Sequence, residues 1–247
     1  MPLLSRFRTV SEADKTKAVT KLVSDATFDF DFLFMIVMSV LMATFGLISA
    51  SEAVVIGSML LAPIMSPILA LALGLSMSSP RLITRSFKTS IKAMIVSVAF
   101  AVGATLLFSF SHFSINDTIL LRTEPSLVSF AIAFVAGLAV TFALVQPNLS
   151  ATLPGVAVAV SLMPPLATVG IGIAHFDVKI TAGALVMFLV NVVGIVFASM
   201  LTFSLMDVHH KRYLVDSAIS KEQKRVEKEE EKVKQVAKQV EEEFKNG

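Results

Sequence analysis

The 247-residue sequence contains no cysteine and no tryptophan, and charged residues make up only 16% of it. The absence of cysteine excludes disulfides and thiolate metal sites. The shortage of charge accompanies a hydrophobic fraction of 55% and a mean hydropathy of +0.77. A soluble domain needs a largely polar surface, and a chain of this composition is too apolar to form one. We therefore expect an integral membrane protein, surrounded mostly by lipid, and not a soluble enzyme.

Catalytic and metal-binding motifs are also missing. The sequence contains no G-x-S-x-G, no H-E-x-x-H and no Walker sequence. Its four histidines lie at or beyond the ends of the apolar segments, at His112, His175, His209 and His210. An enzyme within a membrane would need polar catalytic groups that face the interior of the bundle. We therefore expect no enzymatic activity, no cofactor, no metal and no nucleic-acid partner.

Six apolar runs are long enough to cross a bilayer as helices, which takes roughly 20 residues. They predict an all-α polytopic protein whose spans are Phe32 to Ala50, Ala53 to Met77, Ala93 to Phe113, Leu127 to Gln146, Pro154 to Ala174 and Thr181 to Phe203. Segments such as SSPRLITRSFK and INDTILLRTEPS separate them as loops.

The orientation of the spans follows from the basic residues of the short loops, which are retained on the cytoplasmic side. Lysine and arginine number five before the first span, four between Arg81 and Lys92, and ten after Val208. Each remaining loop contains at most one, namely Arg122 or Lys179. Six crossings place all three basic clusters on one side. We therefore expect a multi-pass protein of the cell membrane with both termini in the cytoplasm.

Two of the spans contain prolines where the interior of a helix is expected. Pro63 and Pro67 lie in the second span, and Pro164 and Pro165 lie in the fifth. Each proline removes a backbone donor and collides with the preceding turn, and Pro165 also moves residue 164 out of the α region. Irregular backbone at this depth needs protein or a watery cavity around it. The sequence therefore predicts that the second and fifth helices are broken.

The two proline-containing spans align with each other at an offset of 98 residues. The identities pair Gly57 with Gly155, Met65 with Met163, Pro67 with Pro165 and Gly74 with Gly172. The preceding spans match as LMATFGLI and LAVTFALV, at an offset of 97. Since three spans reverse the direction of the chain, a repeat of three spans would be inverted about an axis in the membrane plane. The alternative is a chance similarity between apolar, proline-kinked helices.

In such an inverted repeat the two breaks approach each other near the middle of the membrane, as they do in many transporters. Half-helix N-termini suit an anionic group, and unwound carbonyls suit a small cation. The predicted pathway is lined by the prolines and nearby hydroxyl residues, which are Pro63, Pro67, Pro164, Pro165, Ser58, Ser66, Ser161 and Thr168. The alternative is that the kinks only let the helices pack closely at glycines.

Two further polar residues each allow two interpretations. Glu52 is the only carboxylate close to the membrane core, where desolvation would favour a proton or cation site. It would otherwise be a first-turn residue after an N-cap at Ser51, where the helix dipole favours negative charge. Asn191, in the middle of the sixth span, either serves the pathway, by capping a broken helix end or lining the route, or bonds to a neighbouring helix. We favour the first-turn position for Glu52 and the interhelical role for Asn191.

Three segments carry a resemblance to a known family. They are SEAVVIGSMLLAPIMSPI in the second span, GVAVAVSLMPPLATVGIGIA in the fifth and FLVNVVGIVFA in the sixth. These segments resemble the uncharacterised hydrophobic domain family, which is domain-of-unknown-function family 389 of bacteria and archaea. The likeness covers most of residues 32 to 205 and neither charged end. It implies a multi-spanning membrane protein, and it supplies no substrate and no catalytic residue.

The charged ends predict helices outside the membrane. Residues 11 to 24 form a short amphipathic helix that begins with a capping box of Ser11 and Asp14. The tail contains a seven-residue apolar repeat at Ile219, Val226, Val233 and Val240. Its second stripe is poor, so this pattern predicts a marginal coiled coil that would join copies into a homo-oligomer. The alternative is a solvated single helix.

The chain thus divides into five parts. They are a cytoplasmic amphipathic segment (1–31), a first transmembrane repeat (32–113), an external loop (114–126), a second transmembrane repeat (127–205) and a charged cytoplasmic helical tail (206–247). The leading functional hypothesis is a membrane transporter or channel for a small solute or ion, with its site at the broken helices. The alternative is a non-transporting scaffold or sensory module that oligomerises or recruits partners through its C-terminal helix.

Overall fold

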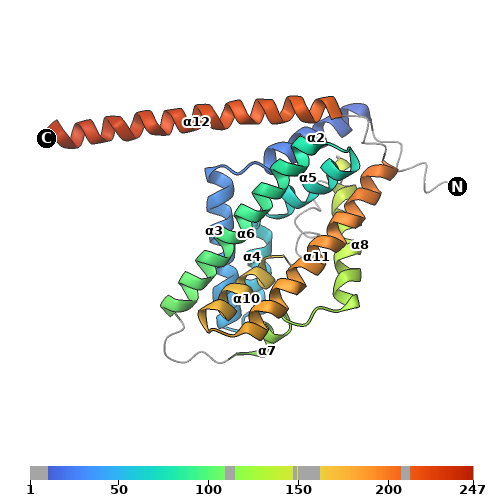
Figure 1. The fold of residues 1–247 in the computed structure, drawn as a ribbon, viewed down its shortest axis with the longest axis vertical. Coiled ribbons are helices and arrows are strands. Elements are labelled where there is room, and N and C mark those ends of the chain that lie inside the picture. The colour runs from blue at the N-terminus through green and yellow to red at the C-terminus, as the bar shows by residue number, and fades with distance from the viewer. Residues whose placement is uncertain (1–10, 109–114, 147–148, 150–161, 207–211, 247) are drawn as a thin grey trace.

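The computed structural model describes residues 11–108, 115–146, 149, 162–206 and 212–246, and every regular element in these ranges is helical (Figure 1). The predicted all-α class is therefore confirmed. The principal helices are α2 (Glu12–Asp25), α3 (Phe30–Ile48), α4 (Glu52–Leu61), α5 (Met65–Ser76), α6 (Pro80–Phe108), α7 (Asp117–Leu120), α8 (Leu127–Val145), α10 (Met163–Ala174), α11 (Val178–Leu205) and α12 (Arg212–Asn246).

Four of these helices, α3, α6, α8 and α11, are long and apolar enough to cross a bilayer. The successive helices α4 and α5 together make a fifth such segment, bent by 52° at the break between them. α10 is apolar but has only 12 residues, which is too short to cross alone. The predicted fifth span begins at Pro154, and the residues just before α10 lie outside the described ranges. The described chain therefore contains four or five segments that are able to cross.

The helix of the third predicted span, α6, begins earlier than its apolar run predicts. α6 starts at Pro80, so most of the predicted loop SSPRLITRSFK is helical. Proline suits the first position of a helix, and the buried residues Leu82, Ser86 and Thr89 then recur at helical spacing. Basic residues interrupt the apolar run in these turns, and a search for continuous apolar runs cannot detect an amphipathic helix. The prediction of a loop here was wrong.

The long helices run between two ends of the bundle (Figure 1). α2 and the first turns of α12 lie across one end, which we name the α12 end, and α7 lies at the other, which we name the α7 end. α5 lies toward the α12 end and packs against α2, α6 and α11. α10 lies toward the α7 end and packs against α3, α6 and α11. Each short helix therefore contacts a long helix of the other half of the chain.

The two halves of the chain have helices with matching bounds. α5 and α10 start 98 positions apart, at Met65 and Met163, and they also end 98 positions apart. α6 and α11 start 98 positions apart, and α3 and α8 keep an offset of 97 at both ends. These are the same offsets at which the sequence segments align.

The turns that follow α5 and α10 share one backbone geometry. Ser78 and Phe176, also 98 positions apart, are left-handed with φ of 49° and 56°. In each turn the next backbone N–H donates to a glycine carbonyl, that of Gly74 or Gly172, at 2.9 Å. A Cβ on Gly74 would lie 3.0 Å from a backbone nitrogen of α6, and one on Gly172 would lie 2.8 Å from a backbone nitrogen of α11. Both aligned glycines therefore permit a close approach between consecutive helices.

The two helices outside the apolar bundle cover each other at the α12 end. The Ser11 side chain caps α2 by accepting a bond from Asp14 N at 3.1 Å, which confirms the predicted helix start. Leu22, Val23 and Ile219 are each at most 2% exposed. The apolar face of α2 packs against α5 and α12.

Candidate functional site

A three-residue break, Ala62 to Ile64, separates α4 from α5. Ala62 has an extended backbone with ψ of 112°, and Pro63 has no N–H to donate to the preceding turn. Ser66 N donates to Pro63 O at 3.1 Å, and α5 begins without a side-chain cap. The predicted break at Pro63 is confirmed. Pro67 lies in the first turn of α5, where a helix tolerates proline.

The double proline lies at the start of α10. Pro164 and Pro165 occupy its first turn, where the missing N–H groups would have no helical acceptor, so the prediction that residue 164 leaves the α region was wrong. Thr168 is fully buried, and its Oγ1 donates to Pro164 O at 2.9 Å. Every residue from Met163 to Gly172 is buried. Ser161, the other predicted pathway hydroxyl of this span, lies outside the described residues.

Two more residues of the predicted pathway lie in the packed interior. Ser58 is fully buried, and its Oγ donates to Val55 O at 2.6 Å. The Ser58 carbonyl accepts a bond of 2.7 Å from Ser39 Oγ, which ties the end of α4 to α3. Asn191 is 4% exposed in the middle of α11. The Ser58 hydroxyl thus bonds within α4, and the link between α3 and α4 is made by the Ser58 carbonyl.

Glu52 lies in the first turn of α4, which is the position we favoured. Its carboxylate lies 3.1 Å from the guanidinium of Arg122, in the segment after α7. The Arg122 side chain is 14% exposed and also donates to Thr118 O at 2.7 Å. Ser51 occupies the predicted N-cap position, but its side chain forms no cap bond. No local pattern indicates the pairing of Glu52 with Arg122, because 70 residues separate the two partners.

A recess of about 310 Å³ reaches the first break from the α12 end. Pro63 and Ser66 line it together with three carboxylates, those of Asp25, Asp29 and Asp31. Within the part of the chain that the structure describes, neither Asp25 nor Asp31 forms an ion pair. No group of three or more His, Asp or Glu among the described residues is able to hold a metal ion. The recess is therefore acidic without being a preformed metal site.

Asp29, the third carboxylate, links two of the helices around the recess. Asp29 accepts a bond of 2.7 Å from Arg225 of α12 and caps α3 through its other oxygen. Asp25 keeps an exposed surface, but its pKa is raised, chiefly by partial desolvation. Lys21 lowers the pKa of Asp25, and Glu222 raises it further. The recess was not predicted from the sequence, although the alternation of acids and phenylalanines in SDATFDFDF was a signal.

Comparison with known proteins places these features in a family. The family model for the domain of unknown function DUF389 matches residues 59–197, from the last turn of α4 into α11. An uncharacterised protein of Methanocaldococcus jannaschii is 31% identical over 174 residues, which are 70% of this chain and 53% of the relative. The chain thus spans about half the length of that relative, and no solved structure matches it. Since the family model covers more than half of the sequence, the chain belongs to the DUF389 family, as its resemblance predicted.

Proposed function

We propose that the chain crosses the membrane six times as two inverted three-span repeats, with the α12 end in the cytoplasm. The equal offsets of the helix bounds and the matching turns after α5 and α10 support the repeat. An inversion would put α5 and α10 near opposite membrane surfaces, and they lie toward opposite ends of the bundle (Figure 1). The basic start of α6 lies at the α12 end with α2 and α12, which supports the orientation.

The function we propose is membrane transport of a small ion or solute through the broken helices, with a small cation as the best fit. One observation carries this proposal, which is that the acidic recess ends at the break between α4 and α5. Lining a recess is one of the settings in which irregular backbone is tolerated at membrane depth. Carboxylates at its mouth would concentrate cations, and carbonyls at the break would replace part of their hydration shell.

The burial of the start of α10, where the sequence predicts the second break, supports a closed side of the same route. Pro164, Pro165 and Thr168 are buried in the packed start of α10, whereas Ser66 lines the open recess. Transporters with inverted repeats alternate between conformations in which one side is open and the other is closed. This difference between the start of α10 and the break at Pro63 fits a carrier that is open toward the cytoplasm.

Reconstituted protein tests this function. The full chain in liposomes is expected to raise the flux of Na⁺, K⁺ or protons above that of protein-free liposomes, measured with ion-sensitive dyes. Replacing both Asp25 and Asp31 by asparagine is expected to lower this flux about tenfold, since a charged recess raises the local ion concentration by that order or more. Asp29 is left unchanged because it caps α3 and binds Arg225.

The matched control removes a carboxylate from the other end of the bundle. Glu124 is exposed in the segment before α8, so Glu124→Gln is expected to leave the flux unchanged. Flux equal to that of empty liposomes for all three cations would contradict cation transport. A double variant that transports as fast as the native chain would show that the recess is not the entrance.

A second candidate function is a scaffold that recruits partners through α12. The observation that favours it is the part of α12 that extends past the bundle (Figure 1), where Val233 and Val236 are 68% and 57% exposed. Ile219, the first residue of the predicted seven-residue repeat, is fully buried in the chain's own bundle. Any coiled coil between copies would therefore begin at Val226 or later, and the side chain of Val240 lies outside the described residues.

A further inference from the structure

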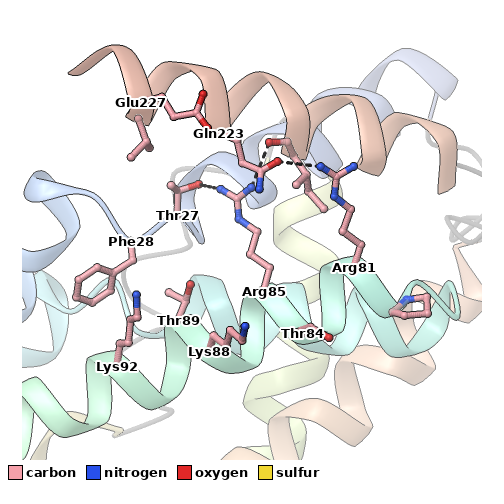
Figure 2. Close-up of a pocket in the computed structure, with 13 residues that line it drawn as sticks. Thr27, Phe28, Arg81, Thr84, Arg85, Lys88, Thr89, Lys92, Gln223 and Glu227 are labelled. Atoms are coloured by element: carbon pink, nitrogen blue, oxygen red, sulfur yellow. Dashed lines mark hydrogen bonds between the residues drawn. The ribbon is translucent and has the colours of Figure 1, made fainter. Parts of the chain in front are cut away.

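Four basic residues follow one face of the first half of α6. Arg81, Arg85, Lys88 and Lys92 are spaced by four, three and four positions, which places them on one side of a helix. They line a pocket of about 750 Å³ at the α12 end. Its other walls are the connection from α2 to α3 and the docked part of α12, and the two arginines point from α6 toward α12 (Figure 2).

Neutral acceptors hold the two arginines in place. Arg85 donates to Thr27 Oγ1 at 2.7 Å and to the carbonyl oxygen of Ile219 at 3.2 Å. Arg81 donates to Gln223 Oε1 at 2.8 Å. These three bonds come from α12 and from the start of the α2–α3 connection, and they fix the guanidinium groups without neutralising them (Figure 2).

Glu222 of α12 lies near enough to Arg85 to attract it electrostatically, so the four positive charges of this pocket are only partly compensated. No carboxylate of the described chain lies within ion-pair distance of any of the four cations, and of the described lining residues only Glu227 is acidic. Thr84 and Thr89 add two hydroxyl groups to the lining. Cations held this closely together favour a bound anion that accepts several hydrogen bonds, as a phosphate group does.

The pocket lies where the charged start of α6 meets its apolar remainder. From Lys92 to its end at Phe108, α6 has no further charged residue. Phe87 and Ile95, near the basic residues, are 55% and 59% exposed, as side chains that face lipid would be. The Lys92 ammonium also lies 5.4 Å from the ring centroid of Phe28, so one wall of the pocket is apolar. In the proposed orientation this is the headgroup layer of the cytoplasmic leaflet.

We propose that the pocket binds the phosphate headgroup of an anionic phospholipid from the cytoplasmic leaflet. Basic pockets between helices on this side of a membrane suit anionic headgroups. A soluble phosphate compound would meet the same cations, but only a lipid would also use the exposed apolar surface at Phe87 and Ile95. Since α6 and α12 both line the pocket, a bound lipid would stabilise the docked position of α12. The inference rests on the proposed orientation and not on transport.

Lipid binding to the purified full chain tests this site. The chain in a nonionic detergent is titrated with phosphatidylglycerol or with zwitterionic phosphatidylcholine, and the bound lipid is counted by native mass spectrometry. Lys88→Gln combined with Lys92→Gln is expected to weaken phosphatidylglycerol binding about tenfold or more. Both side chains are exposed and neither holds α12, so the variant is expected to fold. Lys221→Gln combined with Lys224→Gln removes the same charge from exposed positions outside the pocket and is expected to change nothing.

Three results would overturn the proposal. They are equal phosphatidylglycerol affinity in the native chain and the pocket variant, equal affinity for the two lipids, and complete displacement of bound lipid by millimolar inorganic phosphate. The last result would assign the pocket to a soluble anion. Cation flux is measured independently, so a chain that binds lipid without transporting would refute transport and leave this site standing.

Discussion

An alanine at position 170 is expected to destabilise the protein strongly. Gly170 lies where α10 crosses α6, and a Cβ there would overlap the Cβ of Ala101 and lie 3.0 Å from the backbone nitrogen of Val102. Backbone atoms cannot rotate away as a flexible side chain can, so the two helices would have to separate. Overpacking of this kind costs about 1–3 kcal/mol of unfolding free energy. In a chain of this size the expected fall in Tm is about 2–12 °C.

Thermal unfolding of the detergent-solubilised chain, followed by far-ultraviolet circular dichroism, measures this effect. Gly103→Ala is the matched control, because Gly103 lies in α6 close to the same crossing and a Cβ added to it would have no neighbouring atom within 4 Å. Alanine is favoured over glycine in a helix by about 1 kcal/mol, so the control is expected to keep or raise the Tm. Equal Tm values for Gly170→Ala and the native chain would contradict the close packing of α6 against α10.

Shortening the C-terminal helix is expected to destabilise the protein only if the cut removes its docked part. A chain that ends at Met206 loses Val215 and Ile219, both fully buried, and uncovers the part of α2 that packs against α12. Burying one such aliphatic side chain stabilises by about 1.5–3 kcal/mol, so the expected loss is on the order of 3–6 kcal/mol. A chain that ends at Glu229 keeps these contacts and the bond from Arg225 to Asp29, and is expected to keep its Tm.

The longer of these two chains also tests self-association through the tail. If exposed residues beyond Glu229 join copies of the chain, its mass in detergent, measured by light scattering, falls to that of a monomer. An unchanged oligomeric mass would remove this part of α12 as the cause. A chain that ends at Met206 and unfolds at the native temperature would contradict the docking of α12 on α2.

Apolar runs predicted the long helices well because the exposed and the buried positions of these helices are both largely hydrophobic, so each helix is apolar around most of its circumference. The bounds of α8, Leu127–Val145, differ from the prediction by one residue. The same method failed at the start of α6, where only one face is apolar. It also failed at α7, a single turn that Asn116 caps by accepting a bond from Ile119 N.

Most of the candidate site could not be predicted, because it is formed by contacts between residues far apart in the sequence. The sequence located the prolines and therefore the break at Pro63, because the missing N–H is a property of the residue itself. It did not show that the acidic residues before α3 fold over this break, nor that α12 returns to supply Arg225. The amphipathic patterns of α2 and α12 indicate that one face of each helix is covered. They do not identify the segment that covers it.

The accessibility of position 66 tests the proposed route most directly, and the native chain has no cysteine to interfere. Single cysteines are placed at Ser66, at the buried Thr168 and at the exposed Gln223, and each variant is treated from either side with a small membrane-impermeant thiol reagent. We expect that Ser66→Cys and Gln223→Cys react from the cytoplasmic side and that Thr168→Cys is protected. Protection of Ser66→Cys from both sides, while Gln223→Cys still reacts, would contradict a watery route to the break.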